Sequence, residues 1–439
     1  MDRRGFTALA LGAGFGLTGL AGRATPAAGL DARAVADNWY RLILELVRHT
    51  PTYSPPVASR AFAYLGVTAY EAIASGRPEM APLAGQLAGL SPAPVREAGA
   101  GHDEGIVLQA ALKASVAAFF GNTGPTGQHA ISRMSEVMDG KAAEGVAPDV
   151  AARSAAHGQA VAAHVLAWSA GDGGATVGNL GFPMTWTLSD APGAWKPTSL
   201  IRLQQAPLLP LWGGNRPFAM PSAEACDLPL PPAYSEDPSS AFYAEAKEVL
   251  DVSRALTEEQ KAIARFWSDD PMLSSTPPGH WVAITRGALA GRGAGIAEGV
   301  EVMMRVSVAV ADAFIASWRI KYRDNLLRPV TYIRATMDKG FTPLLNTPPF
   351  PEYPSGHSAQ SGAAAAVLTA HFGDGFAFTD DSHADDGLPA RSFPSFEAAA
   401  GEAALSRLYG GIHFRSGIDQ GLVLGRCVGA HSVALKTEA

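Results

Sequence analysis

The spacing of apolar residues constrains the fold of this chain more than any other feature. Trp39, Leu42, Ile43 and Leu46 recur at intervals of three and four residues, which places them on one face of an α-helix. Comparable, mostly alanine-rich patterns cover residues 56–75, 104–120, 127–141, 150–169, 241–250, 258–267, 281–290, 297–322, 358–372, 396–408 and the chain from about 417. No long segment alternates as a strand would. The sequence therefore predicts an all-α fold.

A long region separates two groups of these helical patterns. Proline, glycine and tryptophan dominate residues 171–236, and low-complexity sequence is nearly absent there. Many aromatic residues in a long connection indicate an ordered loop rather than a flexible linker. We therefore expect two four-helix-bundle-like halves with this loop region between them.

The first 29 residues resemble an export signal. Arg3 and Arg4 precede Phe6, and a Gly/Ala-rich, modestly apolar run follows, as in twin-arginine signals. The mature chain is then residues 30–439, for which we expect no membrane span and a periplasmic or secreted location. Cys226 and Cys427 could pair in an oxidising compartment, but their spacing does not show whether they meet.

The charge of the chain excludes one class of partner. The net charge is −7 with 17% charged and 47% apolar residues, so there is no basic footprint for nucleic acid. Any anion site must therefore come from a local cluster of cations.

The first candidate motif for such a cluster lies in WRIKYRDNLLRP. Lys321 and Arg328 are seven residues apart, so on one continuous helix both would lie on the same face. Pro329 would end that helix and leave Arg328 at its end. A pair at this spacing is more often a solvated face than a site.

The second motif is YPSGH, which precedes a small-residue helix. Ser355 is a favourable N-cap, and Gly356 would let a ligand approach the backbone. The N–H groups of Ser355, Gly356 and His357 would then point from the helix N-terminus toward an anion. By itself this motif is better explained as an ordinary capped helix with a surface histidine.

The third motif is SRLYGGIHFRSGID, in which Arg407 precedes His413 by six residues. Gly410 and Gly411 break the helix and permit a tight turn. A lone histidine here would ordinarily belong to the core. Together, however, the three motifs supply Lys, two Arg, a helix N-terminus and two histidines, as a tetrahedral oxyanion site requires.

These residues resemble the superfamily of vanadium-dependent haloperoxidases and type 2 phosphatidic acid phosphatases. Its pattern of K-x6-RP, PSGH and SR-x5-H is present in order, so the anion site is expected within residues 318–419. Upstream segments that also resemble bacterial haloperoxidases are residues 39–72, 192–198 and 266–281.

The resemblance implies a role for each matching residue. The oxygens of vanadate would be held by Lys321, Arg328, Ser355, Gly356 and Arg407. In addition, the resemblance makes His413 the direct ligand of vanadium and His357 the acid–base group. It also places Trp318 and Phe350 on the halide side of the site.

Two carboxylates are expected to support these groups. Asp270, with Asp269 as competitor, matches an acid that supports an arginine. The family often has Asp four residues after the second histidine, where this chain has Gly417. Either Asp419 orients His413 from further along or another group does so.

Three functions fit these observations. The leading hypothesis is a vanadate-dependent haloperoxidase that uses hydrogen peroxide to oxidise halide to hypohalous acid. The second is a soluble periplasmic acid phosphatase that works through a phosphohistidine at His413, since phosphate can occupy the same site. The third is an oxyanion-binding protein without activity, which the acid–base His357 disfavours. The sequence does not give the oligomeric state.

Overall fold

The computed structural model describes residues 30–177, 181–183, 185–199 and 202–439, so the predicted export segment lies outside the described residues. The first half contains α1 (Ala32–Arg48), α2 (Pro55–Ala74), α3 (Glu104–Phe119), α4 (Pro125–Ala142), α5 (Pro148–Ser169) and the short α6 (Gly174–Val177). The second half contains α7 (Ala241–Arg254), α8 (Glu258–Phe266), α9 (Thr276–Arg292), α10 (Ile296–Asp324), α11 (Pro329–Thr336), α12 (Gly356–Phe372), α13 (Phe396–Tyr409) and α14 (Arg415–Val433).

The predicted all-α class is confirmed, with one small addition. Strands β1 (Phe378–Asp380) and β2 (Arg391–Phe393) form an antiparallel pair in which Thr379 faces Ser392. Three-residue strands are too short to show alternation, which is why the sequence did not reveal them. The short 3₁₀ segments are η2 (Arg202–Gln205), η3 (Trp212–Gly214) and η4 (Ala384–Asp386).

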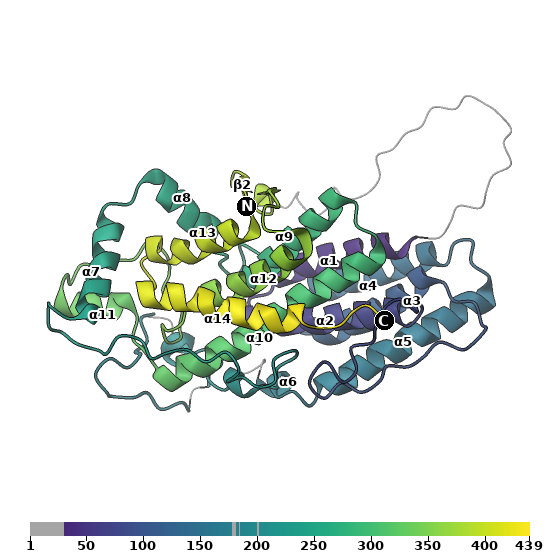
Figure 1. The fold of residues 1–439 in the computed structure, drawn as a ribbon, viewed down its shortest axis with the longest axis horizontal. Helices are drawn as coiled ribbons and strands as arrows, with labels where there is room; N and C mark the ends of the chain where they lie inside the picture. The colour runs from purple at the N-terminus through teal and green to yellow at the C-terminus, as the bar shows by residue number, and fades with distance from the viewer. Residues whose placement is uncertain (1–29, 178–180, 184, 200–201) are drawn as a thin grey trace, which may run out of the picture.

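Helix α10 belongs to both hydrophobic cores. Met303 and Val308 pack into the core of α1 to α5, whereas Val306 and Val310 pack into the core of α7 to α14. In Figure 1, α3 and α5 lie at one end of the elongated molecule and α7 and α11 at the other, with α10 between them. The two halves therefore share a central helix rather than meeting only through the loop region.

The loop region is attached to α10 by a buried carboxylate. Asp312 accepts hydrogen bonds from the backbone N–H groups of Phe218, Ala219 and Met220, at 2.7, 2.8 and 3.0 Å. Burial raises the pKa of Asp312 to about 6, although these hydrogen bonds oppose the shift. Buried polar groups need such partners, so Asp312 fixes this part of the loop against the shared helix.

The end of α10 differs from the sequence prediction. The helix ends at Asp324 because Asn325 adopts a left-handed conformation, with φ of 47°, which Asn tolerates better than most residues. Arg328 is instead the N-cap residue of α11, and Pro329 begins that helix. The prediction that Lys321 and Arg328 share one helix is therefore wrong, and helix α11 was not predicted.

A disulfide joins the two cysteines whose pairing the sequence left open. Cys226 lies in the loop region and Cys427 on α14, and their sulfur atoms are bonded. The bond closes a separation of 201 residues. In the chain-entropy view, such a long closed loop restricts the unfolded state more than a short one would.

We predict that stability falls on acidification partly through His157 on α5. Its ring contacts Ser75 Oγ at 2.9 Å, and burial, followed by Arg96 and His102, lowers its pKa to about 4. A histidine whose pKa is lowered in the folded state stabilises the fold at pH values above about 6.5, its pKa in the unfolded chain. This stabilisation is lost as the pH falls toward 4.

The His157→Asn variant should therefore lose less of its free energy of unfolding than the parent protein between pH 7 and pH 5. We expect a difference of about 1–2 kcal/mol, because solvent screens part of the surrounding charge. Urea denaturation at the two pH values measures it. Equal losses in the two proteins would contradict the assignment.

Candidate oxyanion-binding site

Lys321, near the end of α10, is completely buried. Its ammonium group donates hydrogen bonds to the backbone carbonyls of Pro351, Glu352 and Pro354. Burial, with Arg328 nearby, holds its pKa well below the usual value, and Glu352 partly opposes that shift. The three ammonium protons are thus directed at backbone oxygens, and Lys321 acts on the site mainly through its charge.

Arg328 is also completely buried and lies beside His413. Its Nε donates to Phe350 O at 2.9 Å, and its Nη1 donates to Ile412 O at 2.9 Å. Nη1 lies 3.1 Å from His413 Nε2. Its Nη2 has no hydrogen-bond partner among the described residues, so one N–H-bearing nitrogen of a buried cation is available for a ligand.

The third cation, Arg407, reaches the site from α13. It is 4% exposed, and its guanidinium donates to the carbonyl of Trp267 and to Ser406 Oγ. Burial lowers its pKa to about 10, against the opposing charges of Asp269 and Asp270. Three cations from three different elements are therefore buried near one another.

The predicted cap of α12 is confirmed, with one correction. Ser355 is the N-cap, and its Oγ accepts the N–H of Ser358 at 3.2 Å. The N–H of Ser355 is not free, because it donates to Gly417 O at 2.8 Å. Among the described residues no backbone carbonyl accepts the N–H of Gly356 or His357, so these two groups remain at the positive end of the helix.

A carboxylate that the sequence analysis did not identify fixes the orientation of His413. Glu352 Oε1 lies 2.6 Å from His413 Nδ1 and accepts the N–H of Phe414 at 3.0 Å. Because a guanidinium can only donate, the contact from Arg328 requires a lone pair on Nε2. Nδ1 then carries the proton and donates it to Glu352.

The charges around His413 keep its ring neutral. Burial, followed by Arg328 and Lys321, holds the pKa of His413 well below its usual value. Burial raises the pKa of Glu352 to about 7, although the same two cations oppose the shift. The result is a buried imidazole with its Nε2 lone pair directed toward Arg328.

Gly417 explains how Glu352 replaces the expected carboxylate. A Cβ atom at Gly417 would lie 2.4 Å from Glu352 Oε1, so the position where the family often has Asp is filled from another loop. Asp419 is exposed, and its electrostatic neighbours are Arg415 and Glu248. The group that contacts His413 is therefore Glu352, not Asp419. The sequence feature that could have identified Glu352 is that it is the single acidic residue in PFPEYPSGH, directly before the predicted helix.

His357 faces Asp269, and both Asp269 and Asp270 act on Arg407 through their charge. His357 Nε2 lies 3.6 Å from Asp269 Oδ2 and has no hydrogen-bond partner among the described residues. Burial, followed by Arg407, lowers its pKa to about 4. Burial also raises the pKa of Asp270, which Arg407 partly opposes, so Asp270 acts on the arginine through its charge.

Two aromatic rings cover the cations. The ring centroids of Trp318 and Phe350 are 4.9 Å apart. The Nζ of Lys321 lies 5.2 Å and the Cζ of Arg328 4.9 Å from the centroid of Phe350. A Cβ at Gly356 would lie 3.3 Å from the ring of Trp318, so glycine permits this approach. The predicted aromatic pair thus borders the cation cluster.

The residues fit a tetrahedral oxyanion. Burial, followed by neighbouring positive charge, lowers the pKa values of Lys321 and His413, and an anion between these groups would relieve the repulsion between the charges. Arg328 Nη2 and His357 Nε2 supply polar atoms that find no partner in the part of the chain that the structure describes. The N-terminus of α12 adds backbone N–H groups that favour negative charge.

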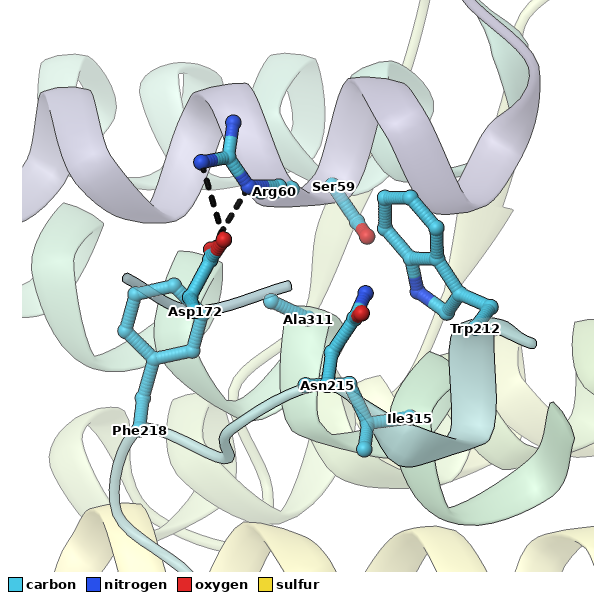
Figure 2. A pocket seen from close by; sticks show the side chains of 8 residues that line it. All are labelled: Ser59, Arg60, Asp172, Trp212, Asn215, Phe218, Ala311 and Ile315. Carbon is cyan, nitrogen blue, oxygen red and sulfur yellow. Dashed lines mark hydrogen bonds and ion pairs between the residues drawn. The ribbon is translucent and has the colours of Figure 1, made fainter. Parts of the chain in front are cut away.

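A cavity elsewhere has a structural explanation. Figure 2 shows Arg60 and Asp172 beside Trp212 and Asn215, and none of the predicted site residues lines this cavity. Arg60 Nε lies 2.6 Å from Asp172 Oδ2, which also accepts a hydrogen bond from Tyr64. Arg60, Asp172 and Tyr64 are therefore paired with one another.

Known proteins resemble this chain in sequence and in fold. The family described as the VCPO second helical-bundle domain matches residues 301–438. A solved structure described as the first bacterial vanadium-dependent iodoperoxidase is 38% identical and superposes with a TM-score of 0.82, covering 92% of this chain and 97% of its own.

A holo-type bacterial vanadium-dependent chloroperoxidase shares the fold at 17% identity and a TM-score of 0.70, covering 88% of this chain and 93% of its own. The apo-type form is 16% identical with a TM-score of 0.68, and the match covers 89% of this chain and 95% of its own. No curated protein sequence matches significantly.

We predict that Gly417→Ala destabilises the protein by about 1–3 kcal/mol, because the added methyl group overlaps the buried carboxylate of Glu352. Gly401→Ala on α13 is the matched control, since a Cβ there meets no atom within 4 Å. That helix-interior change should instead stabilise by about 0.5–1 kcal/mol.

Urea denaturation of both variants gives the comparison. In a double-mutant cycle, Gly417→Ala should cost less when Glu352 is already alanine, because the overlap is then removed. An unchanged cost in that background would show that Glu352 does not occupy this space.

Proposed function

This chain belongs to the vanadium-dependent haloperoxidase family, and we propose that it oxidises halide with hydrogen peroxide when vanadate is bound. One observation carries the proposal. The Nε2 lone pair of the neutral, buried His413 is fixed by Glu352 and lies beside the buried cation Arg328. A fixed imidazole nitrogen next to buried positive charge suits a metal oxyanion.

We assign the oxyanion contacts to the residues around that nitrogen. Arg328 would donate through Nη2, Arg407 would supply charge and N–H groups, and Lys321 would supply charge. The N-cap Ser355 and the N–H of Gly356 would hold oxygens at the start of α12. Bound vanadate would supply a Lewis-acidic centre for activating peroxide, and His413 would hold it through Nε2.

His357 would move protons at the reacting oxygen. Its lowered pKa of about 4 leaves the ring neutral near pH 7, so it can accept a proton from hydrogen peroxide and return it to a leaving oxygen. The nearby Asp269 stabilises the protonated form of the ring during this exchange.

The aromatic pair supports a halide substrate over a phosphate ester. Trp318 and Phe350 place apolar rings beside Lys321 and Arg328, which excludes water from the cations and strengthens their field. A weakly hydrated halide loses little hydration free energy when it binds beside these apolar rings. The 38% identical iodoperoxidase makes iodide the first halide to test.

Export through the N-terminal segment agrees with the disulfide. Arg3 and Arg4 precede an apolar run as in a twin-arginine signal, and the Cys226–Cys427 bond suits an oxidising compartment. Within the described part of the chain, every helix is too short or too polar to cross a membrane. We therefore propose a periplasmic or secreted location.

The proposal predicts vanadate-dependent halogenation. The purified mature chain, loaded with orthovanadate, should halogenate a phenolic dye when supplied with hydrogen peroxide and iodide, bromide or chloride in turn. Hydrolysis of a phosphomonoester without vanadate is assayed in parallel. Rapid hydrolysis together with no halogenation by any halide would instead establish the phosphatase.

Two histidine variants should separate binding from proton transfer. His413→Ala should abolish vanadate binding measured by calorimetry, because it removes the direct ligand. His357→Ala should retain vanadate but lower kcat by about 10²–10⁴-fold, as expected for a lost acid–base group. His371→Ala is the control, because His371 lies near the other end of α12 and pairs with Glu298 of α10. Full activity in His357→Ala would refute its role.

A further inference from the structure

A second cluster of potential ligands lies behind His357. Asp269 follows α8, His280 lies on α9, and His383 precedes η4. One ligand atom from each lies within 4.8 Å of the others, and all three residues are buried. Their exposed fractions are 3%, 2% and 6%. Two imidazoles and one carboxylate form a common donor set for a transition-metal ion.

In each histidine, one ring nitrogen contacts a carboxylate other than Asp269. His280 Nε2 lies 2.7 Å from Asp380 Oδ2, and His383 Nδ1 lies 3.0 Å from Asp386 Oδ2. Asp386 is itself paired with Arg48. A carboxylate that accepts from one ring nitrogen and leaves the other for metal is the usual support of a metal-binding histidine.

The remaining ring nitrogens converge on Asp269. His280 Nδ1 lies 3.1 Å from both carboxylate oxygens. His383 Nε2 lies 3.3 Å from Oδ1, yet it is buried without a hydrogen-bond partner among the described residues. A ligand between this nitrogen, the carboxylate and the second imidazole would satisfy all three groups.

We propose that Asp269, His280 and His383 bind a divalent cation of the zinc class. The donors are one Asp269 oxygen, His280 Nδ1 and His383 Nε2, and water completes a tetrahedral shell. Binding releases to solvent any proton carried by His280 Nδ1 or His383 Nε2, because both nitrogens must offer lone pairs.

The cation site is distinct from the oxyanion site but adjoins it. Asp269 Oδ2 lies 3.6 Å from His357 Nε2, so a cation at Asp269 would fix the carboxylate that faces the acid–base histidine. The cation would join the segment after α8, helix α9 and the segment between β1 and η4, and it would offset part of the negative charge that Asp269 presents to His357. This inference does not depend on whether the chain oxidises halide.

Metal analysis tests the proposal without an activity assay. The full mature chain, freed of any affinity tag, is dialysed against a chelator, then against Zn²⁺, and desalted. Mass spectrometry of the metal content should show about one zinc per chain, and chelation should lower the thermal midpoint. A chain that retains no zinc would overturn the proposal.

Variants locate the metal. Asp380→Asn keeps the shape of the residue and should weaken zinc binding about 10–100-fold, as expected for an outer partner. His383→Ala should lose more. His371→Ala and His413→Ala should retain zinc, which separates this cluster from a surface histidine and from the oxyanion site. If the folded Asp380→Asn and His383→Ala proteins retained as much zinc as the parent chain, the proposed zinc site would be refuted.

Cobalt gives a measurement that needs no variant. The metal-free parent chain titrated with Co²⁺ should develop the intense visible bands of a four-coordinate site with nitrogen and oxygen donors. Zn²⁺ should then abolish those bands by displacement. Cobalt that binds only with the weak bands of a six-coordinate, water-rich site would contradict the proposal.

Discussion

The buried ammonium group of Lys321 determines the shape of the oxyanion site. A cation without solvent needs polar partners, and three carbonyls of residues 351–354 turn inward to provide them. That turn delivers Glu352 to His413 and Ser355 to the start of α12. Lys321 can occupy this place because α10 belongs to both cores and is held along most of its length.

Glu352 and Gly417 illustrate how the same chemistry can be built from different residues. The orientation of His413 requires one carboxylate at Nδ1 and does not depend on which segment supplies it. Here the loop before α12 provides it, and the absent side chain at Gly417 leaves room. From the sequence, either Asp419 or another group could orient His413, because positions along the chain do not show which carboxylate is near in space.

The predictable parts of the structure rest on local rules. Periodic apolar residues predicted most helices, and the N-cap role of Ser355 was confirmed. The same rules failed at Asn325, whose left-handed backbone ends α10 before Pro329. They also could not show that the N–H of Ser355 bonds to Gly417. Asn permits a left-handed residue without requiring one, and the bond from Ser355 joins segments distant in sequence.

The sequence by itself determined the all-α class, the identity of the cations and histidines, and the family resemblance they carry. These follow from residue type and short-range spacing. Only the tertiary structure decided which carboxylate serves which histidine: Glu352 at His413 and Asp269 at His357. Such pairings depend on how α10, α12 and the intervening loops pack, because buried charges select partners by distance in space and not by separation in sequence.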